Sequence, residues 1–197
     1  MVMADELGHT PIVRRREDVY ELLFGRYETV YHPPVDVLPH IDVYVHAPTA
    51  ERVFFTLVTG GMSDAAMSAP TGAPRRAELV AYTSEPTKLL AQKLAGLAAT
   101  PYDQSTWLGW GHSSDCGPIA PSSPLEALLL LEPPIQPDAS LGSYLEIEAE
   151  PVDLFWAFPI TAKERDYKVE HGTAALLGLF TEGVPLTVEP HRSDITA

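Results

Sequence analysis

Three polar residues in two glycine-containing segments are the strongest candidates for catalysis in this sequence. Ser63 lies in Gly61-Met62-Ser63-Asp64-Ala65, which approaches the nucleophile-elbow pattern, and His112 lies in the second segment. An elbow puts its serine on a strained strand-to-helix turn, and its second glycine lets the two elements pass closely. Here Ala65 replaces that glycine and loop-like residues follow it. We therefore expect an ordinary turn, with an enzyme built around Ser63, Asp64 and His112 as the alternative.

The metal-ligating residue types do not form a recognisable metal motif. His112, Asp115 and Cys116 offer three donors on one segment, but zinc also needs a fourth ligand or a water, and Gly117-Pro118 supplies no second ligand pair. We expect these side chains to hydrogen-bond locally. Because the remaining histidines are scattered along the sequence, we expect the purified protein to hold no stoichiometric metal and no cofactor. Because Cys116 is the only cysteine, no intrachain disulfide can form, which favours a reducing compartment.

One predicted strand carries polar and aromatic residues at alternate positions: His40, Asp42, Tyr44 and His46. Alternate side chains of a strand share a face, so these four could together bind a ligand or a partner. The simpler interpretation is a solvated face, opposite the apolar Ile41, Val43 and Val45.

The charge balance limits the class of partner. Thirteen Lys and Arg stand against 27 Asp and Glu, a net charge of −14, so the protein repels nucleic acid and anionic membranes. A basic protein partner fits that sign, as does simple solubility. The longest apolar run, Leu128–Leu131, is far below the roughly 20 residues of a membrane span. No apolar segment follows Arg14–Arg16, as a secretory signal requires, so we expect a cytoplasmic protein.

The hydrophobic periodicity predicts an α/β domain of the α+β type, with a mixed, mainly antiparallel sheet and packed helices. We expect a flexible segment over residues 1–16, a single domain over 17–190 and a C-terminal tail over 191–197. Helices are predicted at 17–31, from Pro86 and from Ala162, the last with a capping box and an exposed Glu164–Lys168 pair. Strands are predicted at Ile41–His46, Val53–Thr59, Ala77–Thr83, Leu125–Leu131, Tyr144–Ala149 and Val152–Ile160.

Several strings, in this order, resemble the suppressor of fused (SUFU) domain family in its bacterial, single-domain form. They extend over residues 17–182. The main ones are Thr56-Leu57-Val58-Thr59-Gly60-Gly61-Met62-Ser63-Asp64, Arg76-Ala77-Glu78-Leu79 and Trp107-Leu108-Gly109-Trp110-Gly111-His112. Supporting matches are Ile41-Asp42-Val43-Tyr44, Leu128–Pro133, and the run from Pro159-Ile160 through Glu164, Tyr167-Lys168, Glu170 and Gly172.

The resemblance implies a mixed α/β fold and non-catalytic protein binding. Animal members use this domain together with a second lobe to clamp an extended peptide of a transcription factor. Bacterial single-domain members are proposed immunity proteins that neutralise polymorphic toxins. Because the sequence ends at Ala197, we expect no second lobe, and the animal peptide site is not carried over. The expected role is toxin immunity or regulation, with a toxin domain or a basic peptide as partner; a small-ligand-binding module is a further alternative, and the sequence assigns no oligomeric state.

Two loops are the expected binding region, Gly60–Pro74 and Gly109–Pro124. Long Gly- and Pro-rich loops on a rigid sheet are where recognition residues usually lie. We predict that the two loops lie close together beside one edge of the sheet and that a basic partner contacts residues of both. The predicted protein-binding residues are Gly61, Met62, Ser63, Asp64, Trp107, Trp110 and His112. The alternative is that Trp107 and Trp110 pack inward and the motifs only shape turns.

Overall fold

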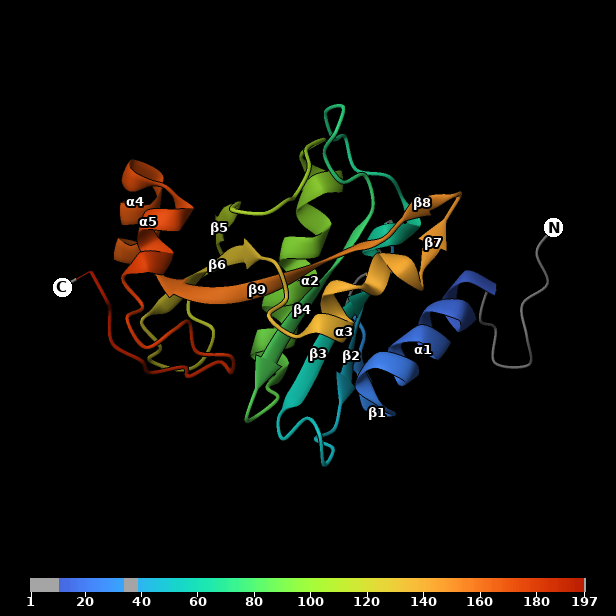
Figure 1. Ribbon diagram of the computed structural model, residues 1–197, viewed down its shortest axis with the longest axis horizontal. Coiled ribbons are helices and arrows are strands. Elements are labelled where there is room, and N and C mark those ends of the chain that lie inside the picture. The colour runs from blue at the N-terminus through green and yellow to red at the C-terminus, as the bar shows by residue number, and fades with distance from the viewer. Residues whose placement is uncertain (1–10, 34–38, 197) are drawn as a thin grey trace.

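The computed structural model describes residues 11–33 and 39–196 and contains a seven-stranded sheet (Figure 1). The strands, in spatial order, are β1 (Tyr27–Tyr31), β2 (Asp42–His46), β3 (Phe55–Gly60), β4 (Ala77–Thr83), β9 (Asp153–Thr161), β6 (Leu125–Leu131) and β5 (Ser113–Asp115). Only β4 and β9 are parallel; the other neighbouring strands are antiparallel. The prediction of a mixed, mainly antiparallel sheet in one domain is therefore confirmed.

Helices cover both faces of this sheet. They are α1 (Pro11–Phe24), α2 (Lys88–Asp103), α3 (Gln136–Ala139), α4 (Ala162–His171) and α5 (Thr173–Gly178), with single 3₁₀ turns η1 (Met62–Asp64) and η2 (Leu141–Ser143). A small separate hairpin is formed by β7 (Glu146–Ile147) and β8 (Glu150–Pro151). In Figure 1, α1 and α3 lie in front of the sheet and α2 lies behind it. No helix within the described ranges is long and apolar enough to cross a bilayer.

Each face of the sheet carries its own apolar core. Val43 and Val45 of β2 belong to the core beneath α2, whereas Tyr44 belongs to the core beneath α1. His46 also lies on the α1 side, where it contacts the Phe24 ring at 5.3 Å between centroids. The prediction that Tyr44 and His46 line a solvated face is wrong, because α1 covers that face with its own aromatic residues.

The first helix differs in position from the prediction. It begins at Pro11 and ends at Phe24, and Gly25 adopts a φ of +83°, the left-handed conformation that commonly terminates helices. Tyr27 and Val30, expected in the helix, therefore belong to the edge strand β1. Residues 11–16, expected to be flexible, are helical; residues 1–10 lie outside the described residues.

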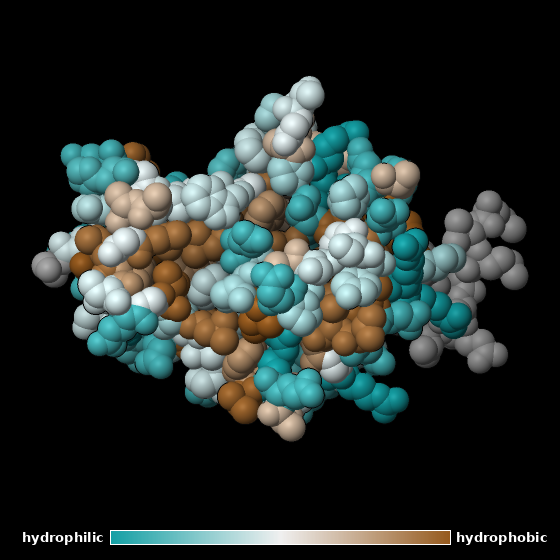
Figure 2. Space-filling view, viewed as in Figure 1, coloured by the Kyte–Doolittle hydropathy of each residue, from teal (hydrophilic) through white to brown (hydrophobic). Residues whose placement is uncertain are grey.

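The C-terminal segment is anchored to α4. The predicted capping box is present between Thr161 and Glu164. However, Glu164 is buried and pairs with Arg192 instead of Lys168, with 2.6 Å between Nη2 and Oε2. The Arg192 guanidinium also lies 5.4 Å from the ring centroids of Phe158 and Phe180. Residues 191–196 thus pack against the domain instead of forming a separate tail. Figure 2 shows apolar side chains reaching the surface in the part of the molecule where α5 and the C-terminal segment meet β9.

His46 is a buried titratable group in the core beneath α1. Its Nδ1 lies 2.6 Å from the Gly25 carbonyl oxygen, so this nitrogen carries the proton and donates it. Burial lowers the pKa of His46 to about 4, the Gly25 hydrogen bond opposes that change, and the Arg52 charge adds to it. The imidazole is therefore neutral at pH 7.

This arrangement predicts a loss of stability in mild acid. The unfolded chain, with an ordinary histidine pKa of about 6.5, binds a proton before the folded chain does. The free energy of unfolding should fall by about 2–3 kcal/mol between pH 7 and pH 4.5 through this residue alone, as urea denaturation at both pH values would measure. His46→Asn should be less stable at pH 7 but lose correspondingly less on acidification. An unchanged pH dependence in His46→Asn, matched against exposed His171→Asn, would contradict this assignment.

Candidate functional site

A buried carboxylate organises the first family motif. Glu78, on β4, is fully buried on the α1 side of the sheet. Its Oε1 accepts hydrogen bonds from the Gly61 amide at 3.0 Å, the Ser63 amide at 3.0 Å and the Ser63 hydroxyl at 2.6 Å. Its Oε2 accepts one from the Thr59 hydroxyl at 2.7 Å. Glu78 therefore fixes the turn that leaves β3.

Helix α1 supplies the positive charge of this cluster. The Arg16 guanidinium lies 2.5 Å from an oxygen of Asp64 and 3.9 Å from an oxygen of Glu78. The Tyr20 hydroxyl, one turn along the helix, donates to the Thr59 carbonyl at 2.6 Å. The pKa of Glu78 is raised, because burial outweighs the Arg16 charge and the hydrogen bonds from Ser63 and Thr59, which lower it. Since every contact to the carboxylate comes from a donor or a cation, the anionic form is the one that the site accommodates.

Two adjacent glycines allow close approach of β2. A Cβ on Gly61, whose φ is +119°, would lie 2.0 Å from the carbonyl oxygen of His40. A Cβ on Gly60 would lie 2.6 Å from the Tyr44 ring. No other residue fits at either position without displacing these neighbours. The Gly60-Gly61 pair thus has a packing function between β3 and the start of β2.

The candidate nucleophile is enclosed by this cluster. Ser63 is fully buried, its hydroxyl donates to Glu78, and its carbonyl accepts from Arg76 at 2.8 Å. A nucleophile needs a base within hydrogen-bonding distance and access to a substrate. Glu78 could act as such a base, but Ser63 is 0% exposed, so a substrate has no access to its hydroxyl. His112 instead packs against Trp107, with 4.3 Å between ring centroids, and burial lowers the pKa of His112.

The two tryptophans of the second motif, Trp107 and Trp110, differ in burial. Trp107 packs against the core beneath α2, and its ring covers Gly109, where a Cβ would lie 2.4 Å from Cζ3. Trp110, by contrast, is 55% exposed. Gly111 donates its amide to the Leu130 carbonyl at 2.7 Å, which joins the motif to β6. The inward packing expected as an alternative for both tryptophans holds for Trp107 only.

The two motif regions meet at one end of the sheet. The Ser68 amide donates to the Thr106 carbonyl at 3.1 Å, and the Leu108 amide contacts the Met67 sulfur at 3.4 Å. The contacts thus connect the loop 60–74 to residues just before Gly109. Strand directions place the ends of β3 and β6 and the starts of β4, β5 and β9 at this same end.

The β7–β8 hairpin also joins this end, which the sequence did not indicate. Glu148 and Glu150 form ion pairs with Arg76, the latter at 3.0 Å, and Glu150 also pairs with Arg75 at 2.6 Å. The charges of Arg75 and Arg76, which directly follow the loop 60–74, are therefore already neutralised by the hairpin.

A shallow groove of about 360 Å³ lies next to Trp110. Acidic Glu132 and Asp153 line it together with Phe155 and small residues of the α3–η2 region. Burial raises the pKa of Asp153. Neither carboxylate has an ion-pair partner among residues 11–33 and 39–196. This groove therefore combines an exposed aromatic ring with uncompensated negative charge.

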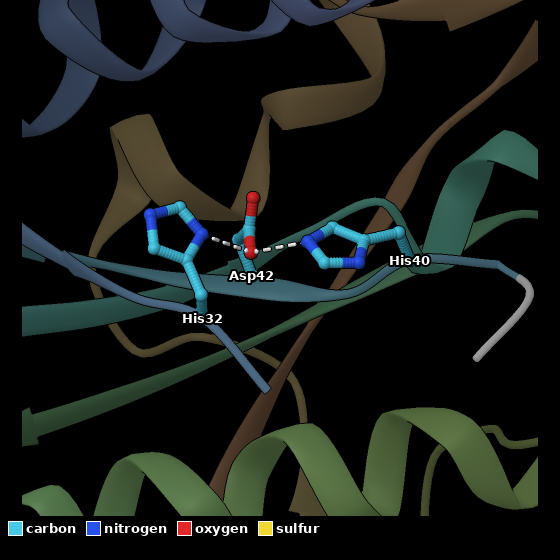
Figure 3. Close-up of side chains that lie close together, drawn as sticks. All are labelled: His32, His40 and Asp42. Carbon is cyan, nitrogen blue, oxygen red and sulfur yellow. Dashed lines mark hydrogen bonds and ion pairs between the residues drawn. The ribbon is translucent and has the colours of Figure 1, made fainter. Parts of the chain in front are cut away.

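The structure adds His32 to His40 and Asp42, two residues that the sequence analysis had placed on one face of a strand. His32, His40 and Asp42 lie side by side, with both imidazole rings turned toward one carboxylate (Figure 3). His32 follows β1 and His40 precedes β2, so only the antiparallel pairing of these strands makes them neighbours. The signal in the sequence was weak, because β1 was assigned to a helix.

Comparisons with solved structures place this architecture in a known class. A SUFU homolog from Neisseria gonorrhoeae FA 1090 superimposes with a TM-score of 0.72 at 18% identity, covering 93% of this chain and 96% of that one. The Sufu–Fu complex matches with a TM-score of 0.67 at 13% identity, covering 94% and 92%. Drosophila Suppressor of Fused matches with a TM-score of 0.60 at 14% identity, and this chain spans 50% of its length.

The family model described as Suppressor of fused protein (SUFU) matches residues 38–193. The chain therefore belongs to the suppressor of fused family, as its motifs predicted. No curated protein matches it.

The Glu78 cluster yields a test that separates a structural serine from a nucleophile. Ser63→Ala removes one hydroxyl donor and should lower the free energy of unfolding by about 1 kcal/mol. Glu78→Gln removes the charge that faces Arg16 and should cost about 3 kcal/mol or more. Urea denaturation measures both values. A serine-reactive fluorophosphonate should leave the folded wild-type protein unmodified; labelling of Ser63 would overturn the structural assignment.

Proposed function

We propose that this chain is a non-catalytic protein-binding domain, and that its partner contacts the groove beside Trp110. The observation that carries the proposal is the 55% exposure of Trp110 next to Glu132 and Asp153. Tryptophan is among the residues most enriched at binding hot spots, where an aromatic anchor lies within a polar rim. An indole so exposed at the motif-bearing end of the sheet is a natural anchor for a second protein.

The remaining motif residues support binding over catalysis. Ser63 and Asp64 are held by Glu78 and Arg16, within hydrogen-bond and ion-pair distance. Substituting Asp64 would leave the buried Arg16 without its nearest carboxylate, so such a variant reports on folding before it reports on binding. Of the residues predicted from sequence to bind a partner, we retain Trp110 as the direct contact. Ser63 and Asp64 instead belong to the cluster around Glu78 and Arg16, and Trp107 packs against the core beneath α2.

The charge of the groove favours a basic partner. Arg75 and Arg76 are paired with the β7–β8 hairpin, so they do not offset Glu132 and Asp153. The chain as a whole carries a net charge of −14, which accelerates encounter with a cationic surface. A basic toxin domain neutralised by this protein, or a basic peptide bound in a regulatory complex, would both present that chemistry. The related Sufu–Fu structure is itself a complex.

A second candidate function is binding of a small apolar ligand. A groove of about 400 Å³ lies between α2 and the β1–β2 pair, lined by Tyr31, Ile41, Val43 and small residues of α2. Its volume lies in the range of small-molecule sites, and like them it is lined mainly by apolar side chains. Native mass spectrometry of the purified protein would detect a retained ligand as added mass.

The protein-binding proposal can be tested by site-specific capture. A photocrosslinking amino acid placed at Trp110 should capture a protein in the native host, whereas the same group at exposed Glu170 on α4 should not. With the captured protein purified, Trp110→Ala should weaken binding by about 2 kcal/mol, roughly 30-fold in Kd, as isothermal titration calorimetry would measure. Glu132→Lys should also weaken the binding of a basic partner, whereas the matched Glu170→Lys should leave the Kd unchanged.

Ser63→Ala provides the second control, since it alters the buried cluster without touching the groove. It should retain the wild-type Kd while lowering thermal stability. Equal binding by Trp110→Ala and wild type, with both proteins folded by circular dichroism, would rule out the groove as the binding surface.

A further inference from the structure

We propose that His32, His40 and Asp42 form a binding site for a divalent transition-metal ion, with zinc as the best-matched ion. His32 Nδ1 lies 2.8 Å and His40 Nε2 lies 3.0 Å from the same Asp42 oxygen, Oδ1. The three ligand atoms all lie within 4.8 Å of one another. In Figure 3 the two rings approach the carboxylate from opposite sides, so one ion can reach all three groups after small ring rotations.

The donor types select the class of ion. Two imidazoles and one carboxylate match the three protein ligands of open zinc sites, in which a water or an outside group takes the fourth position. Calcium and magnesium prefer oxygen ligands, so two nitrogens disfavour them. The carboxylate neutralises part of the charge of the bound ion, and the net charge of −14 attracts cations generally.

The backbone holds these ligands in place from independent directions. Asp42 pairs with Gly60 at the start of β2, and His32 directly follows Tyr31, which pairs with Val43. The His40 carbonyl lies against Gly61, where even a Cβ would clash. The glycine of the family motif thus also fixes the position of one ligand. Preorganisation of this kind lowers the entropy lost when an ion binds.

The exposure of the side chains leaves room for a fourth ligand. The His32 and His40 side chains are 66% and 43% exposed, whereas that of Asp42 is 17% exposed. The carboxylate is therefore the more enclosed ligand of the site, and the two imidazole rings are the more exposed ones. The open side faces solvent, where a water or a partner side chain completes the coordination. A bound ion would also link the end of the edge strand β1 to the start of β2.

This proposal departs from the sequence-based expectation of no metal. That expectation depended on the histidines being dispersed along the chain. His32 and His40 are eight residues apart in the sequence and follow no standard ligand spacing, but the antiparallel pairing of β1 and β2 brings them together. The same ligands without an ion form ordinary histidine–aspartate hydrogen bonds, so direct measurement of metal binding decides between the two states.

The test is titration of the tag-free full chain, stripped with a chelator, with ZnCl₂ at pH 7.5. Isothermal titration calorimetry should give about one Zn²⁺ per chain, and Co²⁺ should produce a visible absorption spectrum of a nitrogen- and oxygen-coordinated ion. The affinity for Zn²⁺ should fall at least about tenfold in each of the variants His32→Ala, His40→Ala and Asp42→Asn. His171→Ala, a histidine beside a glutamate on α4, is the matched control and should bind like wild type.

Circular dichroism and thermal denaturation without metal would verify that each variant folds. The proposal is overturned if wild type takes up no Zn²⁺, or if the double variant His32→Ala/His40→Ala binds it as tightly as wild type. The second outcome would assign binding to other groups, such as His112 and Cys116. Mg²⁺ and Ca²⁺ should not compete at millimolar excess, and competition by either would contradict the assignment to a transition metal.

Discussion

The buried carboxylate of Glu78 is the constraint on which the motif-bearing end of this fold depends. Removing an ionised carboxylate from water is unfavourable by several kcal/mol unless hydrogen bonds and an opposite charge replace the water. Here the replacement comes from the turn after β3 and from Arg16 on α1. The turn, α1 and β4 must therefore assemble together. Without the hydrogen bonds of the turn and the charge of Arg16, the Glu78 carboxylate on β4 would be buried without compensation.

The same principle recurs at two other places, each joining segments distant in sequence. Asp138 of the short helix α3 is fully buried. Its carboxylate accepts hydrogen bonds from Arg52 at 2.6 and 2.9 Å and from the Tyr82 hydroxyl at 2.5 Å. The Glu164 carboxylate likewise accepts a hydrogen bond from the Arg192 guanidinium. A four-residue helix and an irregular C-terminal segment have little intrinsic stability. Their positions therefore depend on these directed ionic contacts together with the apolar cores.

The parts of the fold predicted from the sequence are those whose pattern is local. The β4 boundaries, Ala77–Thr83, and the Thr161–Glu164 capping box follow from residue type and neighbours alone, and the structure has both. The helix predicted through Tyr31 failed because an apolar spacing of three and four residues also occurs by chance across Gly25, whose conformation ends the helix. The exposed Glu164–Lys168 pair failed because the sequence could not show that Arg192 returns to the helix. Helical spacing gives neighbours on one element only.

The site shows the same division between local and long-range information. The sequence identified the glycine-rich motifs but not Arg16 or the β7–β8 hairpin, which complete them from other elements. It likewise missed the proximity of His32 to Asp42, because that proximity requires the register between β1 and β2.

The distribution of roles among the motif residues bears on how one framework serves different partners. Ser63 and Glu78 are buried and hydrogen-bonded to each other, so they shape the end of the sheet from within. Structures that share this fold with the chain are only 13–18% identical to it. A framework maintained by internal hydrogen bonds leaves the outward-facing positions free to differ, since changing them leaves no buried charge unpaired. Under the proposed function, partner choice would rest on exposed side chains such as Trp110 and Glu132, because the buried cluster does not depend on them.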